Sequence, residues 1–261
     1  EVTKPVRKID GAEFDWFRSF DQNYAELGPA ESTTVNLTLV HPSPPDPGTY
    51  SMIITATDQD FDVESQLEIF FDVPVLAQPG VTLPSSEIQV DSLGVTNTTL
   101  DIHNFGNGAQ TYDIEMSSPA GWEVGLLDLG PFQGSRQGST GTLSKGGSIT
   151  AGIMITPPGV LLTSGSTFYA EIIVKSRVSS ETWSYQIPMV IQPSDSIEFT
   201  PGSGGNLEEG VPADSLHEVS IQISNQGNRE VQMSPIERSL PGGWTIQGGL
   251  SDVTVPMGSS V

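Results

Sequence analysis

Residues 100–124, LDIHNFGNGAQTYDIEMSSPAGWEV, contain the pattern that decides the fold. Apolar and polar residues alternate, an Asn-Gly pair interrupts the alternation, and a Pro-x-Gly-Trp corner follows. Alternation with period two predicts a strand on each side of a turn. Residues 219–246, VSIQISNQGNREVQMSPIERSLPGGWTI, have the same pattern. Two copies of one supersecondary unit predict a tandem array.

The two copies agree residue by residue in their turns and corners. We interpret the shared Asn-x-Gly-Asn as a turn that needs positive φ, rather than as a binding loop. The matched pairs are Ile102 and Ile223, Asn104 and Asn225, Gly106 and Gly227, Asn107 and Asn228, and Trp122 and Trp244.

A partial third copy lies at the N-terminus, where residues 27–42 match residues 143–158. Trp16 precedes this block as Trp244 precedes residues 255–261, which match the start of the same block. The middle copy is longer here, and we interpret residues 132–141, FQGSRQGSTG, as an inserted, mobile surface loop.

The copies divide the chain into three predicted domains. These are the C-terminal part of a first repeat (1–78), a complete second repeat (79–193) and the N-terminal part of a third (194–261). Residues 1–78 are expected to lack the strands equivalent to 81–117. The copies meet at short linkers that contain proline, so we expect a semi-rigid row.

When the copies are overlaid in sequence, two further segments with alternating apolar residues are aligned with each other. Pro188 falls on an outward position and predicts an edge strand. The aromatic residues in 14–27 are spaced as on one face of a helix. The overlay of the copies instead aligns this segment with a strand and loop, and we follow the overlay. The two aligned sets are Leu67, Ile69, Phe71, Val73 and Val75, and Trp183, Tyr185, Ile187, Met189 and Ile191.

The middle copy contains seven short alternating segments separated by turns. This number of strands in a domain of this size predicts an all-β fold of tandem Ig-like antiparallel sandwiches, one complete and two partial. The antibody-type disulfide is excluded, because the chain contains no cysteine.

The order of these motifs resembles one particular group of Ig-like domains. The Asn-x-Gly-Asn turn, the P-x-G-W corner and the PGTY strand at 47–50 are similar to domains appended to alpha-galactosidases. Such domains are also repeated in archaeal and bacterial surface proteins. The resemblance implies an extracellular, modular, repeated structure, and it supplies no catalytic residue.

Composition narrows the functional classes. The chain has 32 acidic and 10 basic residues, a formal charge of −22, which disfavours binding to nucleic acid and to anionic membranes. No apolar run is long enough to span a bilayer. The sequence starts at EVTK without a signal peptide, so we expect a processed protein or a piece of a longer one.

The sequence contains no catalytic constellation, so we predict a protein that is not an enzyme. His41, His103 and His217 have no second ligand or base at motif spacing. The best candidate site is a weak one for Ca²⁺, formed by Asp58, Asp60 and Asp62 near a predicted hairpin tip. A solvated acidic hairpin is the favoured alternative, and no other cofactor is expected.

The corner tryptophans, Trp16, Trp122 and Trp244, recur at one position of each copy, as core residues do. We therefore prefer core packing to a sugar-stacking platform. Two sequons begin at Asn36 and Asn97. Asn36 lies between the inward positions Val35 and Leu37, and Asn97 precedes a predicted strand on its outward phase, so both can carry a glycan.

These observations predict a non-enzymatic stalk, spacer or lattice segment of a secreted or cell-surface repeat protein. The partial end repeats require completion by neighbouring repeats of the same or an identical chain, and the second case would build a filament. The alternative is an adhesin or carbohydrate-binding accessory module with surface glycans as partners. An exposed row of aromatic side chains on one sheet would favour the alternative.

Overall fold

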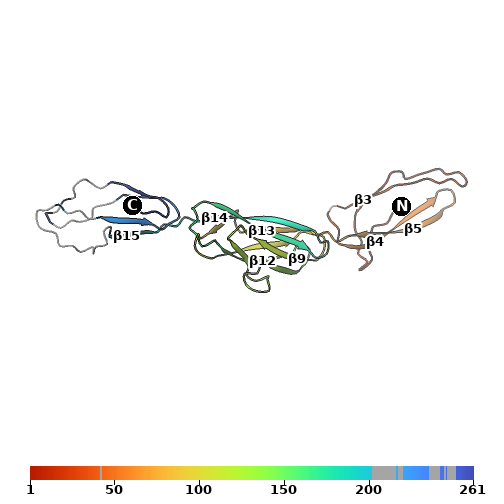
Figure 1. Ribbon diagram of the computed structural model, residues 1–261. Coiled ribbons are helices and arrows are strands. Elements are labelled where there is room, and N and C mark those ends of the chain that lie inside the picture. Colours follow the sequence, from red (N-terminus) through yellow and green to blue (C-terminus); the bar gives the residue numbers. More distant parts are fainter. Residues whose placement is uncertain (42, 202–215, 217–219, 235–241, 244, 246–250) are drawn as a thin grey trace.

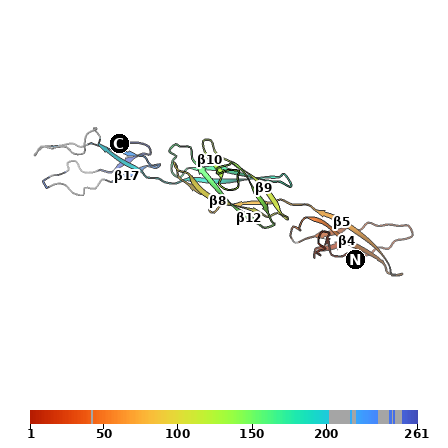
Figure 2. The ribbon, with the colours of Figure 1, turned by 90° about the horizontal axis from the view of Figure 1, so that it is seen from below.

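The computed structural model describes residues 1–41, 43–201, 216, 220–234, 242–243, 245 and 251–261. All regular structure among them is β-strand or turn, so the fold class is all-β, as predicted. Figure 1 shows the strands in three groups along an elongated molecule, with the N- and C-termini in the two outer groups, and Figure 2 shows the same order from below. We call these groups the first unit (β1–β5), the middle unit (β6–β14) and the third unit (β15–β18).

The middle unit is a sandwich of two sheets, ordered β10-β12-β8-β6 and β11-β9-β13-β14-β7. Apart from the parallel pair β14 and β7, neighbouring strands in these sheets are antiparallel. The strands are β6 (Pro79–Thr82), β7 (Ile88–Val90), β8 (Thr96–Asn104), β9 (Gln110–Ser117), β10 (Glu123–Leu126), β11 (Gln137–Leu143), β12 (Ser148–Thr156), β13 (Thr167–Ser176) and β14 (Thr182–Ile191).

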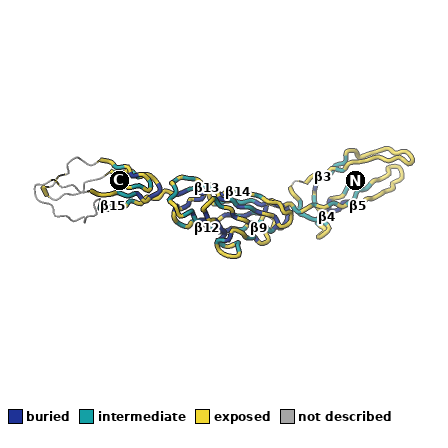
Figure 3. Tube along the Cα trace, viewed as in Figure 1, coloured by how far each residue is buried: buried dark blue, intermediate teal, exposed yellow. Residues whose placement is uncertain are grey.

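The core of the middle unit follows directly from the alternation in the sequence. Figure 3 shows that the buried residues of this unit are concentrated along its strands. Every second residue of β9 and β13 is buried, including Tyr112, Ile114 and Ile172, whereas the residues between them face solvent. Removal of this apolar surface from water drives the two sheets together.

The first unit repeats part of this sandwich. It contains a three-stranded sheet, β1-β4-β5, and the pair β2-β3. Trp16 packs on Tyr50 with ring centroids 5.1 Å apart, and Trp122 packs on Phe168 at 4.9 Å. The strands are β1 (Val6–Arg7), β2 (Phe17–Phe20), β3 (Leu37–Val40), β4 (Gly48–Asp58) and β5 (Val63–Val73). The strand predicted by the overlay, rather than a helix, is therefore confirmed at β2.

The third unit repeats the opposite part of the sandwich. Ile197 pairs with Asn225 as Pro79 pairs with Asn104, so β15 and β16 are equivalent to β6 and β8. Its strands are β15 (Ile197–Pro201), β16 (Ile221–Asn225), β17 (Val231–Met233) and β18 (Val253–Val255). Trp244 lies outside the described residues.

Two local expectations in the middle unit were wrong. The strands predicted on either side of the Asn-Gly pair are present, but the segment between them is not a tight turn within one sheet, because β8 and β9 belong to opposite sheets. The supposed inserted loop, residues 132–141, instead enters strand β11, which pairs with β9 and contains a register shift between Ser139 and Thr142. Its Gly- and Ser-rich composition concealed a strand at the edge of the sheet.

The overlay of the last strands was also displaced by two residues. Tyr50 pairs with Phe71 and the equivalent Phe168 pairs with Met189, so Phe71 corresponds to Met189 and not to Ile187. A shift of two preserves the alternation, which is why the sequence pattern could not reveal it. Pro188 does not mark an edge strand, because β14 lies between β13 and β7, although β7 pairs only from Met189 onward.

The first residues of the chain occupy an edge that was expected to be empty. Val2 bridges to Ile54 and β1 pairs with β4, so residues 2–7 lie along the edge of β4 that β9 takes beside β13. The inward side of the first unit is still partly uncovered. Leu67 was predicted to face the core, yet it is 60% exposed, because its covering strands are not in this unit.

Replacing Trp122 with alanine should destabilise the middle unit by about 3–5 kcal/mol, the range for deleting a large buried aromatic side chain. Trp122 is 3% exposed and packs within the core. Urea unfolding followed by tryptophan-independent circular dichroism measures the loss. The control is Phe132→Ala, at a side chain 70% exposed, which should change stability by less than about 0.5 kcal/mol. Equal stability of the two variants would contradict core packing.

Candidate functional site at the repeat junctions

The most elaborate polar structure in the chain lies where one unit passes into the next. We call residues 104–107 and 225–228 the junction loops, and residues 74–78 and 192–196 the exit segments. Each exit segment follows the last strand of one unit and precedes the first strand of the next. Each junction loop contacts the exit segment of the preceding unit.

The first asparagine of each loop fixes the loop to its own unit. The Asn104 Nδ2 donates to the carbonyl oxygens of Gly108 at 2.8 Å and Leu143 at 3.1 Å. Its Oδ1 accepts from the Gly106 N–H and the Tyr112 hydroxyl, both at 3.0 Å. Because Tyr112 is a fully buried core residue, the core of the middle unit holds the loop in place.

Asn225 has the same role in the third unit. Its Nδ2 donates to the carbonyl oxygens of Arg229 at 2.8 Å and Val255 at 3.0 Å, and its Oδ1 accepts from the Gly227 N–H at 2.9 Å. Asn104 and Asn225 are both buried. Buried amides are stabilising only when they are satisfied, and these two have partners on both sides.

The second asparagine of the first loop binds the preceding unit. The Asn107 Nδ2 donates to the carbonyl oxygens of Pro45 and Pro74, each at 3.0 Å. Its Oδ1 accepts from the Leu76 N–H at 2.7 Å, and its backbone N–H donates to the Leu76 carbonyl oxygen at 3.2 Å. Asn107 is 3% exposed, so its contacts with the preceding unit are largely shielded from water.

Asn228 repeats these contacts at the second junction. Its Nδ2 donates to the Gln192 carbonyl oxygen at 2.7 Å, and its Oδ1 accepts from the Ser194 N–H at 2.8 Å. Its backbone N–H donates to the Ser194 carbonyl oxygen at 2.9 Å, and its own carbonyl oxygen accepts from the Ser164 N–H at 2.9 Å. We call Asn107 and Asn228 the junction asparagines.

The glycine in each loop permits the exit segment to approach. A Cβ atom on Gly106 would lie 2.2 Å from the Leu76 carbonyl oxygen, and one on Gly227 would lie 2.4 Å from that of Ser194. Neither glycine has positive φ, so the predicted turn geometry is wrong. The residue is glycine because a neighbouring unit's backbone fills the space that a side chain would take.

The junction loops recognise backbone groups, and the two exit segments have different sequences. Residues 74–78 read PVLAQ and residues 192–196 read QPSDS, yet equivalent atoms make the same bonds. Phe105 donates its N–H to the Gln78 carbonyl oxygen at 2.8 Å, and Gln226 donates to that of Ser196 at 2.7 Å. The arrangement therefore holds an extended peptide with little dependence on its side chains.

Ion pairs differ between the two junctions. Asp46 of the first unit accepts from Lys145 Nζ of the middle unit at 2.9 Å and from Arg7 Nη1 at 2.8 Å. The bond from Lys145, with the bond from Arg7, holds the pKa of Asp46 below its ordinary value. The third unit has Met257 at the position of Lys145, as the matched pairing of β17 with β18 shows.

The second junction has its own ion pair at another position. Arg229 follows the junction loop, and its Nε donates to Asp195 Oδ1 of the exit segment at 2.6 Å. This bond lowers the pKa of Asp195. Both pairs are substantially exposed to solvent, which screens their attraction, so the buried amide contacts matter more for the junctions.

The predicted calcium ligands lie at the tip of the β4-β5 hairpin. Asp58 Oδ1 accepts from the Asp60 N–H at 2.9 Å and the Phe61 N–H at 3.3 Å, and Asp62 has φ of 53°. Within the described part of the chain, no three His, Cys, Asp or Glu side chains are grouped so that they could hold a metal ion. Asp58, Asp60 and Asp62 are thus not brought together as ligands.

The sequon asparagines are both exposed, but their surroundings differ. Asn97 lies on β8 with its side chain in solvent. The Asn36 Nδ2 donates to Asp21 Oδ2 at 2.6 Å, and the Asn36 N–H donates to Asp21 Oδ1 at 2.9 Å. A glycan on Asn36 would have to displace the bond between its side chain and Asp21.

The histidines with described positions make local contacts only. The His41 ring lies 5.6 Å from the Trp16 ring, and the His103 ring is stacked on Phe105 at 5.3 Å. His217 lies outside the described residues. Trp16 and Trp122 are buried, at 7% and 3% exposure.

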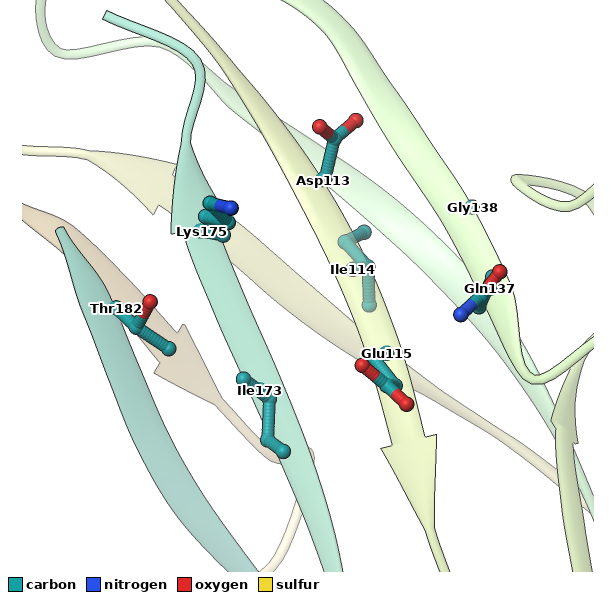
Figure 4. Close-up of a pocket in the computed structure, with 8 residues that line it drawn as sticks. All are labelled: Asp113, Ile114, Glu115, Gln137, Gly138, Ile173, Lys175 and Thr182. Atoms are coloured by element: carbon teal, nitrogen blue, oxygen red, sulfur yellow. The ribbon is translucent and has the colours of Figure 1, made fainter. Parts of the chain in front are cut away.

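A shallow hollow of about 440 Å³ lies on the outer face of the five-stranded sheet, over β9, β11, β13 and β14 (Figure 4). Its wall includes Asp113, Glu115, Lys175 and Ile173, and none of its lining residues is aromatic. Asp113 already accepts from Arg177 Nε at 2.8 Å. This surface lacks the aromatic platform that would favour a sugar site.

The exposed aromatic side chains do not form the row that would favour a binding module. Among the described residues, no sheet carries more than one of them, since Phe17, Phe70, Tyr169 and Phe199 belong to four different sheets. The others lie in connections between strands: Tyr24, Phe61, Phe105 and Phe132. The described residues contain no helix that is long and apolar enough to cross a bilayer.

Comparison with known proteins gives no family for this chain. No family model matches, and no curated protein matches its sequence. Domains 4 and 5 of the S-layer protein SbsC are similar with a TM-score of 0.29 and 11% identity, over 56% of this chain and 66% of that one. At so low a score the likeness carries no argument about function.

Two further solved structures are similar at the same level. The E. coli chaperone DraB has a TM-score of 0.28 and 12% identity, over 70% of this chain and 83% of that one. PapD-like domain 7 of human CEP192 has a TM-score of 0.27 and 13% identity, over 44% and 83%. The Ig-like sandwich assignment therefore stands on the strand pairing described above.

Replacing Asn107 with alanine should open the first junction locally. The change removes two donors and an acceptor and leaves the Leu76 N–H and two carbonyl groups without partners, a loss of about 1–3 kcal/mol. Amide hydrogen exchange at Leu76 should accelerate by roughly tenfold or more, since about 1.4 kcal/mol corresponds to a factor of ten. The matched control is Asn228→Ala, which should accelerate Ser194 and leave Leu76 unchanged. Unchanged exchange at Leu76 in Asn107→Ala would contradict the assignment.

Lys145→Met, which introduces the residue of the third unit, should raise the pKa of Asp46 toward its ordinary 3.8. Because the pKa of Asp46 is lowered in the docked state, the ion pair stabilises the junction fully at pH values above the ordinary pKa of this carboxyl group. The contribution is lost as pH falls through the lowered pKa. Carboxyl NMR titration of Asp46 measures the change, with Arg229→Met as the control that should move Asp195 instead. An unchanged pKa of Asp46 in Lys145→Met would refute the contact between the two side chains.

Proposed function

We propose that this chain is a stiff, non-enzymatic spacer segment of an extracellular or cell-surface array of Ig-like repeats. The single observation that carries the proposal is the pair of junction asparagines, Asn107 and Asn228, buried between consecutive units. A connection used only as a tether would not need buried, satisfied amides at two successive junctions. Equivalent contacts at both junctions make the spacing between units a repeated property of the array.

The division into repeats 1–78, 79–193 and 194–261 belongs to this proposal. The first and third units each contain part of the sandwich seen complete in the middle unit. Exposed apolar side chains such as Leu67, 60% exposed, support completion by neighbouring repeats of the same or an identical chain. Completion between identical chains would extend the array into a filament.

The setting is inferred from the surface and from the resemblance of the motifs. A formal charge of −22 favours solubility in an extracellular or surface environment and disfavours partners rich in phosphate. The order of the turn, corner and PGTY motifs supports the group of Ig-like domains associated with alpha-galactosidases. Asn97 and Asn36 are proposed glycan sites, with Asn97 modified more fully because Asp21 holds the Asn36 amide.

Small-angle X-ray scattering of the whole chain tests the spacer function. Wild type should scatter as one extended particle with a narrow range of maximum dimensions. The double variant Asn107→Ala, Asn228→Ala should populate bent forms and shorten the mean dimension. Its middle unit should unfold cooperatively as in wild type, because both side chains lie outside the hydrophobic core.

The control pair separates the spacer from the adhesin. Thr182→Ala and Lys175→Ala alter the surface hollow and should leave the scattering unchanged. Tight binding of wild type to defined glycans, lost in these hollow variants while the junction variants scatter as wild type does, would replace the spacer by the carbohydrate-binding alternative.

A further inference from the structure

The two junctions differ in the residue that follows the junction asparagine. Asn107 is followed by Gly108, whereas Asn228 is followed by Arg229. A Cβ atom on Gly108 would lie 2.8 Å from Pro47 Cγ and 3.2 Å from Pro47 Cδ. Pro47 belongs to the first unit, just before β4. Close packing between the first and middle units therefore enforces an Asn-Gly pair at the first junction.

An Asn-Gly pair carries its own chemistry. The backbone nitrogen of the glycine can attack the asparagine Cγ, because no side chain shields it. A bond forms between that nitrogen and Cγ, the Cγ–Nδ2 bond breaks, and the NH₂ group leaves as ammonia with the proton of the glycine N–H, which gives a cyclic imide. Water then opens the imide to aspartate or isoaspartate, so the net change replaces the side-chain NH₂ by an oxygen. Asparagine is among the thermolabile residues for this reason.

The docked junction opposes this reaction through geometry. The Asn107 amide is fixed by its bonds to Pro45, Pro74 and Leu76, and the residue is 3% exposed. Attack by the Gly108 nitrogen requires the side chain to leave these partners and to turn its Cγ toward that nitrogen, and opening of the imide requires access of water. Both conditions are met when the first unit separates from the middle unit.

The product cannot restore the junction. A carboxylate at position 107 has no hydrogen to donate, so it would place negative charge against the carbonyl oxygens of Pro45 and Pro74, which Nδ2 now contacts at 3.0 Å each. Isoaspartate would in addition insert a backbone carbon into the junction loop. Leaving buried acceptors without donors next to a buried charge is strongly unfavourable.

We propose that Asn107–Gly108 is a self-modifying site that converts opening of the first junction into a permanent hinge by deamidation. The proposal rests on the spacer function, because only a stiff junction can be lost in this way. The second junction is its internal counterpart, since Arg229 shields the nitrogen after Asn228 and binds Asp195. The array would then lose stiffness first between the first and middle units.

The test uses the whole chain and a variant that opens one junction. Leu76→Pro removes the N–H that binds Asn107 Oδ1, and Ser194→Pro is the matched change at the second junction. Each protein is incubated at mildly alkaline pH and digested, and peptide mass spectrometry with isoaspartate detection reports position 107. Deamidation of Asn107 should be slow in wild type and in Ser194→Pro, and severalfold faster in Leu76→Pro.

Two outcomes of the incubation overturn the proposal: equal rates of conversion in wild type and Leu76→Pro, or no conversion of Asn107 in the opened junction. Gly106→Ala, whose Cβ would lie 2.2 Å from the Leu76 carbonyl oxygen, opens the same junction without a new proline and serves if Leu76→Pro fails to fold. The same two outcomes apply. Scattering of wild type and Asn107→Asp separates the two proposals. A loosened Asn107→Asp chain without deamidation on opening refutes this inference and leaves the spacer function standing. An Asn107→Asp chain as stiff as wild type also refutes this inference, because the product would then be no hinge. Only a wild-type chain that scatters as a flexible particle refutes the spacer function.

Discussion

The arrangement of this molecule depends on a buried carboxamide between consecutive units. Asn107 presents two N–H donors to the carbonyl oxygens of Pro45 and Pro74 and one acceptor oxygen to the Leu76 N–H. An aspartate would lack the donors, and an apolar residue would leave the exit segment's polar groups buried without partners. The requirement is therefore for a carboxamide with this reach, and Asn228 meets it again at the second junction.

The hydrophobic core and the junction are connected through Asn104. The alternation of apolar residues in β8 and β9 builds the core, and the fully buried Tyr112 extends its hydroxyl to Asn104 Oδ1. Asn104 in turn fixes the loop that presents Asn107. A folded sandwich thus has a preorganised surface at its end. Because the junction loop is already ordered, binding of the extended exit segment costs little further conformational entropy in the loop. In the proposed spacer, stiffness between units would follow from stability within them.

Sequence periodicity predicted the all-β class and the tandem sandwiches, because inward and outward residues alternate clearly in β9, β13 and β14. It failed where the local pattern is compatible with two arrangements. The Asn-Gly pair predicted a turn between two strands, but β8 and β9 lie in opposite sheets, and this long-range arrangement is not encoded in local turn preferences. The strand β11 was missed because serine, glycine and threonine supply its pairing without an apolar alternation.

The junctions were half visible in the sequence. Recurrence of the second asparagine in both copies was a usable signal, because a turn explained by Asn104 and Gly106 alone has no need of Asn107. The partners were not predictable, since Asn107 binds backbone atoms of Pro45 and Pro74 and leaves no complementary side chain to recognise. The contact of Lys145 with Asp46 was also not predictable from the repeats. The third unit has Met257 in place of Lys145, so only the backbone geometry recurs there.

The most direct test of stiffness is the distribution of distances across one junction. Spin labels at two exposed positions, Glu64 in the first unit and Glu181 in the middle unit, report it by pulsed electron spin resonance in frozen solution. The account predicts one narrow distribution in the native sequence and a broad one when Asn107 is replaced by alanine. A broad distribution in the native sequence would contradict a junction held by a buried asparagine.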